Sequence, residues 1–152
     1  MNDGAYSCPA CSSFLVPRSS GKGQVWVCGS CAGCLIGISL LREGVDAKAV
    51  GRFWSQARVL PHSRVCPACR RSFATATVPD GPELDACRTC YLVWCDGGEL
   101  ERLPRRNPAV DPPSRLRSPP AAAPGEVQKE ADNLALTLDA ASIVLEVLAS
   151  WS

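Results

Sequence analysis

Histidine is almost absent from this sequence. The chain contains a single one, His62. Hydrolytic and nucleophilic active sites need a base that is combined with a second group. Because the sequence offers no such combination, we expect the protein not to be an enzyme. We expect His62 to be an ordinary solvated loop residue.

Long apolar runs are also missing. The sequence has no stretch of 18 consecutive apolar residues, so it predicts no membrane insertion. The first residues, Met1 to Gly4, carry no basic region and no apolar core, and we therefore read no secretory signal there. These features predict a cytoplasmic protein, in which thiols stay reduced and an even number of cysteines does not imply disulfides.

Aromatic residues are scarce, with four Trp, two Tyr and three Phe among 152 residues. Ten cysteines account for part of the 46% hydrophobic fraction. Units of about 40 residues rarely fold on an apolar core alone. A structural metal would compensate, because its binding free energy, about 10–16 kcal/mol in small finger peptides, is also folding free energy.

Eight of the ten cysteines form two quartets with nearly the same spacing. The leading Cys-x-x-Cys pair recurs after 58 residues and the trailing pair after 59. Two such pairs joined by a hairpin complete a tetrahedral set of four thiolates around Zn²⁺, so we expect two zinc ions per chain. The predicted metal ligands are Cys8, Cys11, Cys28 and Cys31 for one ion, and Cys66, Cys69, Cys87 and Cys90 for the other.

An all-cysteine ligand set indicates a structural role. Four thiolates leave no open position on a tetrahedral ion, whereas catalytic zinc keeps one position for water or substrate. Iron in the same ligand set stays open as an alternative. Thiol–disulfide exchange is disfavoured, because each Cys-Pro-Ala-Cys motif precedes a predicted hairpin and is matched by a second pair, unlike thioredoxin-type motifs at a helix start.

The metal also changes the charge of the protein. The formal net charge is +1 without metal. Eight thiolates contribute −8 and two Zn²⁺ ions contribute +4, so the loaded chain carries −3. Affinity for nucleic-acid phosphates comes mostly from Lys and Arg, and this balance therefore disfavours a nucleic-acid partner.

Apolar patterns and turn residues divide the first part of the chain. Residues 1–44 form a first ribbon, with strands predicted over 14–16 and 24–27 on either side of a turn-rich stretch from Pro17 to Gly23. Residues 45–61 predict a helix that Asp46 caps and Pro61 ends. One face of this helix is apolar, and its members are Val45, Ala49, Val50, Phe53, Trp54 and Ala57.

A second ribbon is predicted over residues 62–103. A strand is expected from Phe73 to Val78, followed by a turn at Asp80-Gly81-Pro82. Asp96 with Glu99 three residues later is a capping pattern, so a short helix is expected to start at Asp96. Each ribbon is thus predicted as a β-hairpin plus a short helical element, which makes a small metal-stabilised α+β fold.

The last third of the chain differs in composition. Residues 104–125 contain seven prolines and four arginines, which predicts a disordered linker. Residues 126–152 predict an amphipathic helix that either docks on the ribbons or binds a partner or a second copy. Its five acidic residues argue against anionic membranes. The apolar stripe consists of Val127, Ala131, Leu134, Leu138, Ala141, Leu145 and Leu148.

Cys34 and Cys95 fall outside both quartets. At the repeat offset, the equivalent of Cys34 is Val93, and the equivalent of Cys95 is Ile36. Because neither cysteine recurs, we expect both to be small buried hydrophobic residues, with a reactive thiol as the alternative.

The second ribbon resembles the transcription factor IIB-type zinc-binding family of small bacterial zinc ribbons. The resemblance implies a ribbon fold and zinc binding, without implying transcription-factor activity. Leu92 departs from the Gly that is common there, and Cys95 departs from the usual Leu. The matching residues are Cys66-Pro67-Ala68-Cys69, Cys87-Arg88-Thr89-Cys90, Val93-Trp94, Asp96 and Glu99-Leu100.

The first ribbon matches the same pattern more loosely and resembles a diverged duplicate. Leu35 takes the place of the Trp, Gly37 that of the Asp, and Leu40-Leu41 that of the Glu-Leu pair. The two copies together suggest tandem zinc ribbons.

We therefore expect a zinc-binding adaptor or regulator that recognises another macromolecule, in the first place a protein, through its C-terminal helix. Self-association through that helix is an additional option. A nucleic-acid-binding ribbon is the main alternative, and a zinc- or redox-responsive thiol switch is a third. The nucleic-acid alternative would use Arg64, Arg70, Arg71 and Arg88, with Trp94 for stacking.

Overall fold

The computed structural model describes residues 5–20, 23–107 and 109. The predicted amphipathic helix over 126–152 and most of the predicted linker over 104–125 lie outside these residues. The described elements are β1 (Leu15–Ser20), β2 (Gly23–Cys28), β3 (Cys34–Gly37), α1 (Ile38–Gly44), α2 (Ala47–Gln56), β4 (Ala74–Thr77), β5 (Glu83–Cys87), β6 (Leu92–Cys95) and the 3-10 turn η1 (Leu100–Arg102).

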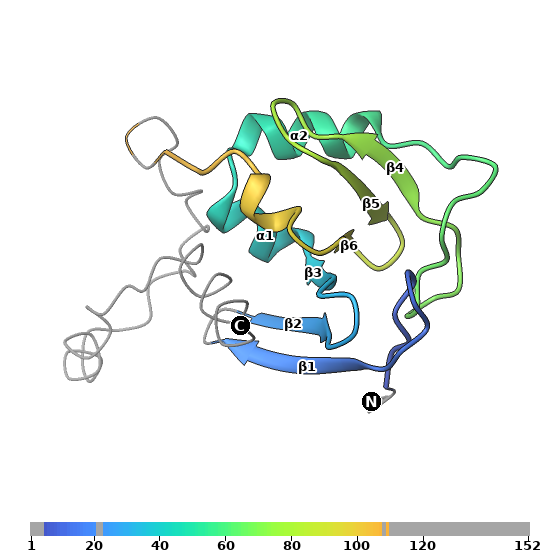
Figure 1. Cartoon of the computed structure of the whole chain (residues 1–152). Coiled ribbons are helices and arrows are strands. Elements are labelled where there is room, and N and C mark those ends of the chain that lie inside the picture. Colours follow the sequence, from blue (N-terminus) through green and yellow to red (C-terminus); the bar gives the residue numbers. More distant parts are fainter. Residues whose placement is uncertain (1–4, 21–22, 108, 110–152) are drawn as a thin grey trace, which may run out of the picture.

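The strands of both ribbons join in one antiparallel sheet, in the order β1-β2-β3-β6-β5-β4. The two ribbons meet at β3 and β6, whose pairing runs from Cys34↔Cys95 to Gly37↔Leu92. Figure 1 shows the chain passing from the blue hairpin of the first ribbon to the green hairpin of the second, with β3 and β6 between them. Each ribbon therefore contributes a third strand beyond the predicted hairpin.

The seam between the ribbons has a near two-fold centre. Leu35 pairs with Trp94 across the seam. These two residues are 59 positions apart, which is also the offset between the trailing cysteine pairs. Equivalent residues of the two repeats therefore meet at the centre of the seam. This is the arrangement that a two-fold relation between two copies of one unit requires.

The sheet has two buried faces, because successive side chains of a strand point to opposite sides. In β6, Trp94 belongs to one apolar cluster and its neighbours Val93 and Cys95 to another. We call the side of the sheet with the Trp94 cluster the cysteine face, and the side with the Val93 and Cys95 cluster the helix face. The cysteine face comprises Cys8, Leu15, Cys28, Leu35, Cys66, Phe73, Cys87, Leu92 and Trp94.

The helix face is covered by α1, which contacts β3, and by α2, which contacts β4. Figure 1 shows both helices beside the strands. α2 begins after Asp46, whose carboxylate accepts a hydrogen bond from the backbone N–H of Ala49 at 2.8 Å. Phe53 is fully buried on its inner side. The predicted cap and apolar face of this helix are confirmed.

Two details of the first ribbon and of α2 differ from expectation. The turn-rich stretch from Pro17 is strand up to Ser20, and β2 begins at Gly23. Pro17 is compatible with β1 because this strand lies at the edge of the sheet, where a missing N–H breaks no ladder. α2 ends at Gln56 rather than near Pro61, since the backbone of Arg58 pairs with Thr75.

The helix expected to start at Asp96 is also shorter than predicted. Only the turn η1 forms, beginning at Leu100. The side chain of Glu99 does accept a hydrogen bond from the backbone N–H of Asp96 at 2.8 Å, as in a capping box. The Asp96 carboxylate, however, binds Trp94 and Arg64 instead of the helix start.

Among the described residues, none of the helices has the length and apolar content needed to cross a bilayer.

Arg88 joins the second ribbon to α2, and its removal should weaken this junction. Its guanidinium donates to the carbonyl oxygens of Trp54 at 2.7 Å and Ala57 at 3.0 Å, where the helix dipole is negative. We expect Arg88→Ala to lower the free energy of unfolding of the zinc-loaded protein by about 1–2 kcal/mol. Chemical denaturation followed by circular dichroism measures this.

Arg52→Ala is the matched control, because Arg52 is exposed on the same helix. Its effect should stay within about 0.5 kcal/mol. Equal losses for the two variants would contradict a specific role for Arg88.

Candidate metal centres

The four Cys-x-x-Cys turns share one backbone conformation. In each, the residue after the second cysteine has a positive φ, although none of the four is glycine. A left-handed residue reverses the chain and lets the two sulfurs point at a common position. The four residues are Ser12 with φ 65°, Ala32 with φ 60°, Arg70 with φ 63° and Tyr91 with φ 58°.

Backbone hydrogen bonds close these turns. In the first turn, the N–H of Ser12 donates to the carbonyl of Cys8 at 2.9 Å, and the N–H of Cys8 donates to the carbonyl of Ser13 at 2.7 Å. The turns that begin at Cys28 and Cys66 have the same two bonds. Three of the four turns are thus held by the same backbone bonds.

The sulfurs of each quartet lie close enough to share one ion. All four Sγ atoms of each quartet are within 4.8 Å of one another. The Sγ–Sγ distances are 3.6 Å for Cys8–Cys31 and 3.4 Å for Cys11–Cys28. A tetrahedral zinc–thiolate centre has sulfurs about 3.8 Å apart, whereas a disulfide bond is about 2.05 Å long. The donor set fits zinc, and each centre could bind one ion.

The second quartet has the same arrangement. Cys69 and Cys87 have their Sγ atoms 3.5 Å apart. Backbone N–H groups point at ligand sulfurs in both centres, from Ala10 to Cys8 and from Cys90 to Cys87, each at 3.4 Å. Such bonds favour the thiolate form that a metal requires.

These two quartets are the metal-binding groups of the described part of the chain. The structure therefore brings together all eight predicted cysteines, four in each group. His62 is exposed and joins neither group.

In the absence of metal, the four thiols of a centre do not ionise alike. Hydrogen bonds from Ser13 lower the pKa of Cys11 to about 6. Burial raises the pKa of Cys31 to about 12 and that of Cys66 to about 11. Burial also opposes ionisation of Cys69, but hydrogen bonds from the Arg71 backbone and from Cys87 lower its pKa to about 7. A divalent cation supplies the charge that lets all four become thiolates together.

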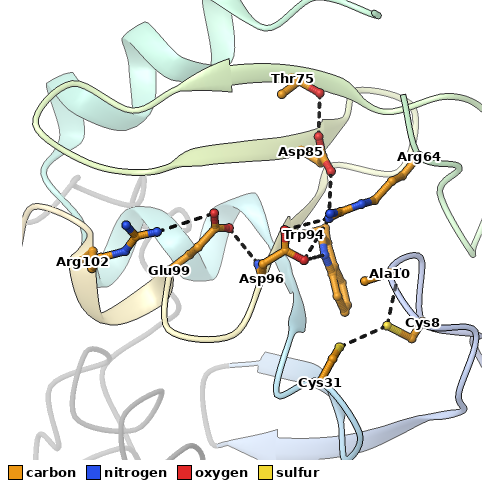
Figure 2. Close-up of polar contacts among 10 residues, drawn as sticks. All are labelled: Cys8, Ala10, Cys31, Arg64, Thr75, Asp85, Trp94, Asp96, Glu99 and Arg102. Atoms are coloured by element: carbon orange, nitrogen blue, oxygen red, sulfur yellow. Dashed lines mark hydrogen bonds and ion pairs between the residues drawn. The ribbon is translucent and has the colours of Figure 1, made fainter. Parts of the chain in front are cut away.

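A polar network explains why the ribbon motif contains a Trp and an Asp. The indole Nε1–H of Trp94 donates to Asp96 at 3.0 Å, and Arg64 donates to the same carboxylate at 2.9 Å. Arg64 also contacts Asp85 at 3.5 Å, and Asp85 accepts from the hydroxyl of Thr75 at 2.6 Å. Figure 2 shows this chain of contacts ending beside Cys8 and Cys31 of the first centre. The network fixes the indole, which is only 1% exposed.

The two remaining cysteines face each other across the seam. Cys34 pairs with Cys95 in the β3–β6 register, and both are buried on the helix face, as expected for small hydrophobic residues. A hydrogen bond with Cys34 and complete burial raise the pKa of Cys95 well above its usual value. The spacing of the sequence repeat does not predict this pairing. Equivalent positions of the repeat are related by translation along the chain, whereas the two-fold seam pairs Cys34 with a residue at a different position of the repeat.

Comparison with known proteins supports the zinc assignment. Residues 65–106 match the TFIIB-type zinc ribbon model, described as a transcription factor zinc-finger. This match confirms the resemblance of the second ribbon, and the cluster of Cys8, Cys11, Cys28 and Cys31 is consistent with a second, tandem ribbon. No curated protein and no solved structure matches the chain.

Zinc affinity should fall steeply as the pH is lowered. Each centre contains two thiols whose pKa is raised in the metal-free state, Cys8 and Cys31 in one and Cys66 and Cys90 in the other. Because zinc needs thiolates, binding must release at least these protons. We expect the logarithm of each zinc affinity to decrease by at least about two for each pH unit between 8 and 6.

Competition with a chromogenic chelator at several pH values measures this slope. A slope near zero would mean that the sulfurs are not the ligands.

The left-handed turn positions should prefer glycine and reject β-branched residues. Arg70 is the cleanest test, because its side chain is exposed. Relative to Arg70→Ala, we expect Arg70→Gly to stabilise the zinc-loaded protein by about 1 kcal/mol and Arg70→Val to destabilise it by a similar amount. Thermal unfolding at saturating zinc measures the order, and a Val variant as stable as the Gly variant would disprove the turn geometry.

Proposed function

We propose that this protein is a non-enzymatic, zinc-binding adaptor or regulator that recognises another protein. The two ribbons provide a rigid, metal-stabilised body, and the C-terminal segment, for which the sequence predicts an amphipathic helix, would provide the apolar docking stripe. Since four cysteine sulfurs would fill all positions around each ion, the metal would have no position for a substrate.

This proposal rests on the contacts that basic and aromatic side chains of the second ribbon already make within the protein. Arg64 is paired with Asp96 and Asp85, and Arg88 is bound to backbone carbonyls of α2. Trp94 is buried, so its ring cannot stack on a base. Arg71 also donates to the hydroxyl of Thr89 at 3.4 Å, so four of the five residues that would serve a nucleic-acid interface have a contact within the protein.

Arg70 and Arg71 are exposed on the first turn of the second ribbon. Two arginines provide little phosphate affinity in a chain whose loaded charge is −3. A protein partner fits this charge balance better than a nucleic acid does.

We do not expect a partner to bind by adding a strand to the sheet, because both sheet edges are partly blocked. At β1, the N–H of Leu15 already donates to Tyr6 at 2.7 Å, and Pro17 has no N–H to offer. At β4, Thr75 exchanges backbone hydrogen bonds with Arg58. Blocked edges of this kind prevent pairing with another chain. Helix docking through the C-terminal apolar stripe is the remaining mode that the sequence favours.

The C-terminal stripe provides the test of this proposal. Leu138→Asp combined with Leu145→Asp places two charges in the stripe. We expect this variant to lose partner capture and self-association while it keeps two zinc ions per chain. Light scattering after size-exclusion chromatography, a pull-down with the full-length chain as bait, and zinc analysis measure the three properties.

The matched control is Asn133→Asp combined with Ser150→Asp, which adds the same charge on the opposite face of the predicted helix. It should behave as the wild type. If the stripe variant also behaves as the wild type, the docking role of the helix is wrong. Retention on heparin at low salt, with binding to mixed-sequence DNA or RNA that weakens steeply with salt, would replace protein recognition by nucleic-acid binding.

A further inference from the structure

Ligands of both zinc centres lie in one apolar cluster. The cysteine face contains ligands of both centres, Cys8 and Cys28 from the first and Cys66 and Cys87 from the second, in a single cluster. Trp94 belongs to this cluster and lies at the ribbon seam opposite Leu35. Trp94, a residue of the second ribbon, therefore packs in the same apolar interior as ligands of the first centre.

The contact between the ribbons is tight at the turn that supplies two ligands of the first centre. A Cβ atom on Gly33 would lie 2.3 Å from Cζ2 of Trp94 and 2.7 Å from its Cη2. A Cβ atom on Gly97 would lie 2.6 Å from the carbonyl oxygen of Cys31. Glycine at both positions allows the second turn of the first ribbon to lie directly against the second ribbon.

The same indole is connected to the second centre. Trp94 is held by Asp96, which is held by Arg64, and Arg64 lies two residues before the ligand Cys66. The carbonyl of Arg64 accepts the N–H of Phe73 at 2.8 Å, and Phe73 is buried beside the cysteines. Figure 2 shows Trp94 between the Arg64–Asp96 pair and the sulfurs of Cys8 and Cys31.

We propose that the two centres bind zinc cooperatively, with Trp94 and the turn at Gly33 as the coupling contact. Zinc in the second ribbon orders the chain around Cys66, and with it Arg64, Asp96 and the indole. The first ribbon then folds its ligands against a surface that is already formed. By linkage, zinc in the first ribbon must favour zinc in the second by the same factor.

Coupling between sites typically amounts to 5–150-fold in affinity. We expect at least about tenfold here, because the contact is buried and continuous with the sheet. The two ribbons would then load and unload as one unit.

Native mass spectrometry of the full-length chain at limiting zinc tests this proposal. Two identical, independent sites would leave about half of the molecules with one zinc at half-saturation, and unequal independent sites would leave more. For two sites of similar affinity, tenfold coupling predicts about a quarter or less, with metal-free and two-zinc molecules dominating. One-zinc molecules at half of the population or above, together with a first-centre affinity that the loss of Cys69 and Cys90 leaves unchanged, would overturn the proposal.

Gly33→Ala tests the coupling contact, because the added methyl group collides with Trp94 and leaves all eight ligands in place. We expect the one-zinc species to become the main intermediate. Gly37→Ala is the matched control, since a Cβ atom at Gly37 has nothing within 4 Å. It should keep the wild-type distribution. The same distribution in both variants would show that this contact does not transmit coupling.

A reciprocal experiment covers the case in which Gly33→Ala simply disrupts its own turn. Cys69→Ser combined with Cys90→Ser removes two ligands of the second centre and leaves the first ribbon unchanged. Chelator competition should show zinc bound at the first centre at least about tenfold more weakly than in the wild type. An affinity within about twofold of the wild type would mean that the centres are independent.

Discussion

Four cysteine sulfurs around one zinc ion, formed twice in the chain, are the interaction on which the rest of this structure depends. The cysteine face of the sheet shows why. Four of the nine buried residues in its cluster are metal ligands. Without a cation, thiolates so close to one another would repel, and burial favours their protonated form. The five apolar side chains that remain give this face little packing of its own, so the metal must supply much of the free energy that holds it, whereas the helix face has a larger apolar cluster.

Local features of the fold could be read from the sequence because they depend on neighbouring residues. The cysteine spacing indicates the same eight residues that the structure gathers into two groups. Asp46 and the apolar spacing of Val50 and Phe53 define α2. The joining of β3 with β6 could not be read in this way, because short runs such as Cys34-Leu35-Ile36-Gly37 have no helix- or strand-specific pattern. Their pairing is decided by two-fold packing of the duplicated units, which is a property of the assembled fold.

The residues that sequence reasoning misplaced have a common physical reason. Asp96 was expected to cap a helix, and the nucleic-acid alternative used Trp94 for stacking, but the two side chains satisfy each other and Arg64. A buried indole needs a partner for its N–H, and this requirement outweighs a local capping preference. Gly33 stands where a Gly is common after the last cysteine pair of the family pattern, but neither its role nor that of Gly97 could be read from the sequence, because both leave room for a side chain or backbone of the other ribbon. Such requirements exist only once the two ribbons are in contact.

The central claim, that zinc held by sulfur gives each ribbon its shape, is tested most directly by amide NMR spectra of the same sample before and after exhaustive chelation. With two zinc ions per chain, we expect well-dispersed resonances for residues of the β1–β6 sheet. After chelation, we expect these resonances to collapse into the narrow range of an unfolded chain and to return when zinc is added. A dispersed sheet spectrum that persists in the zinc-free protein would contradict the account, since the apolar contacts alone would then suffice to hold the fold.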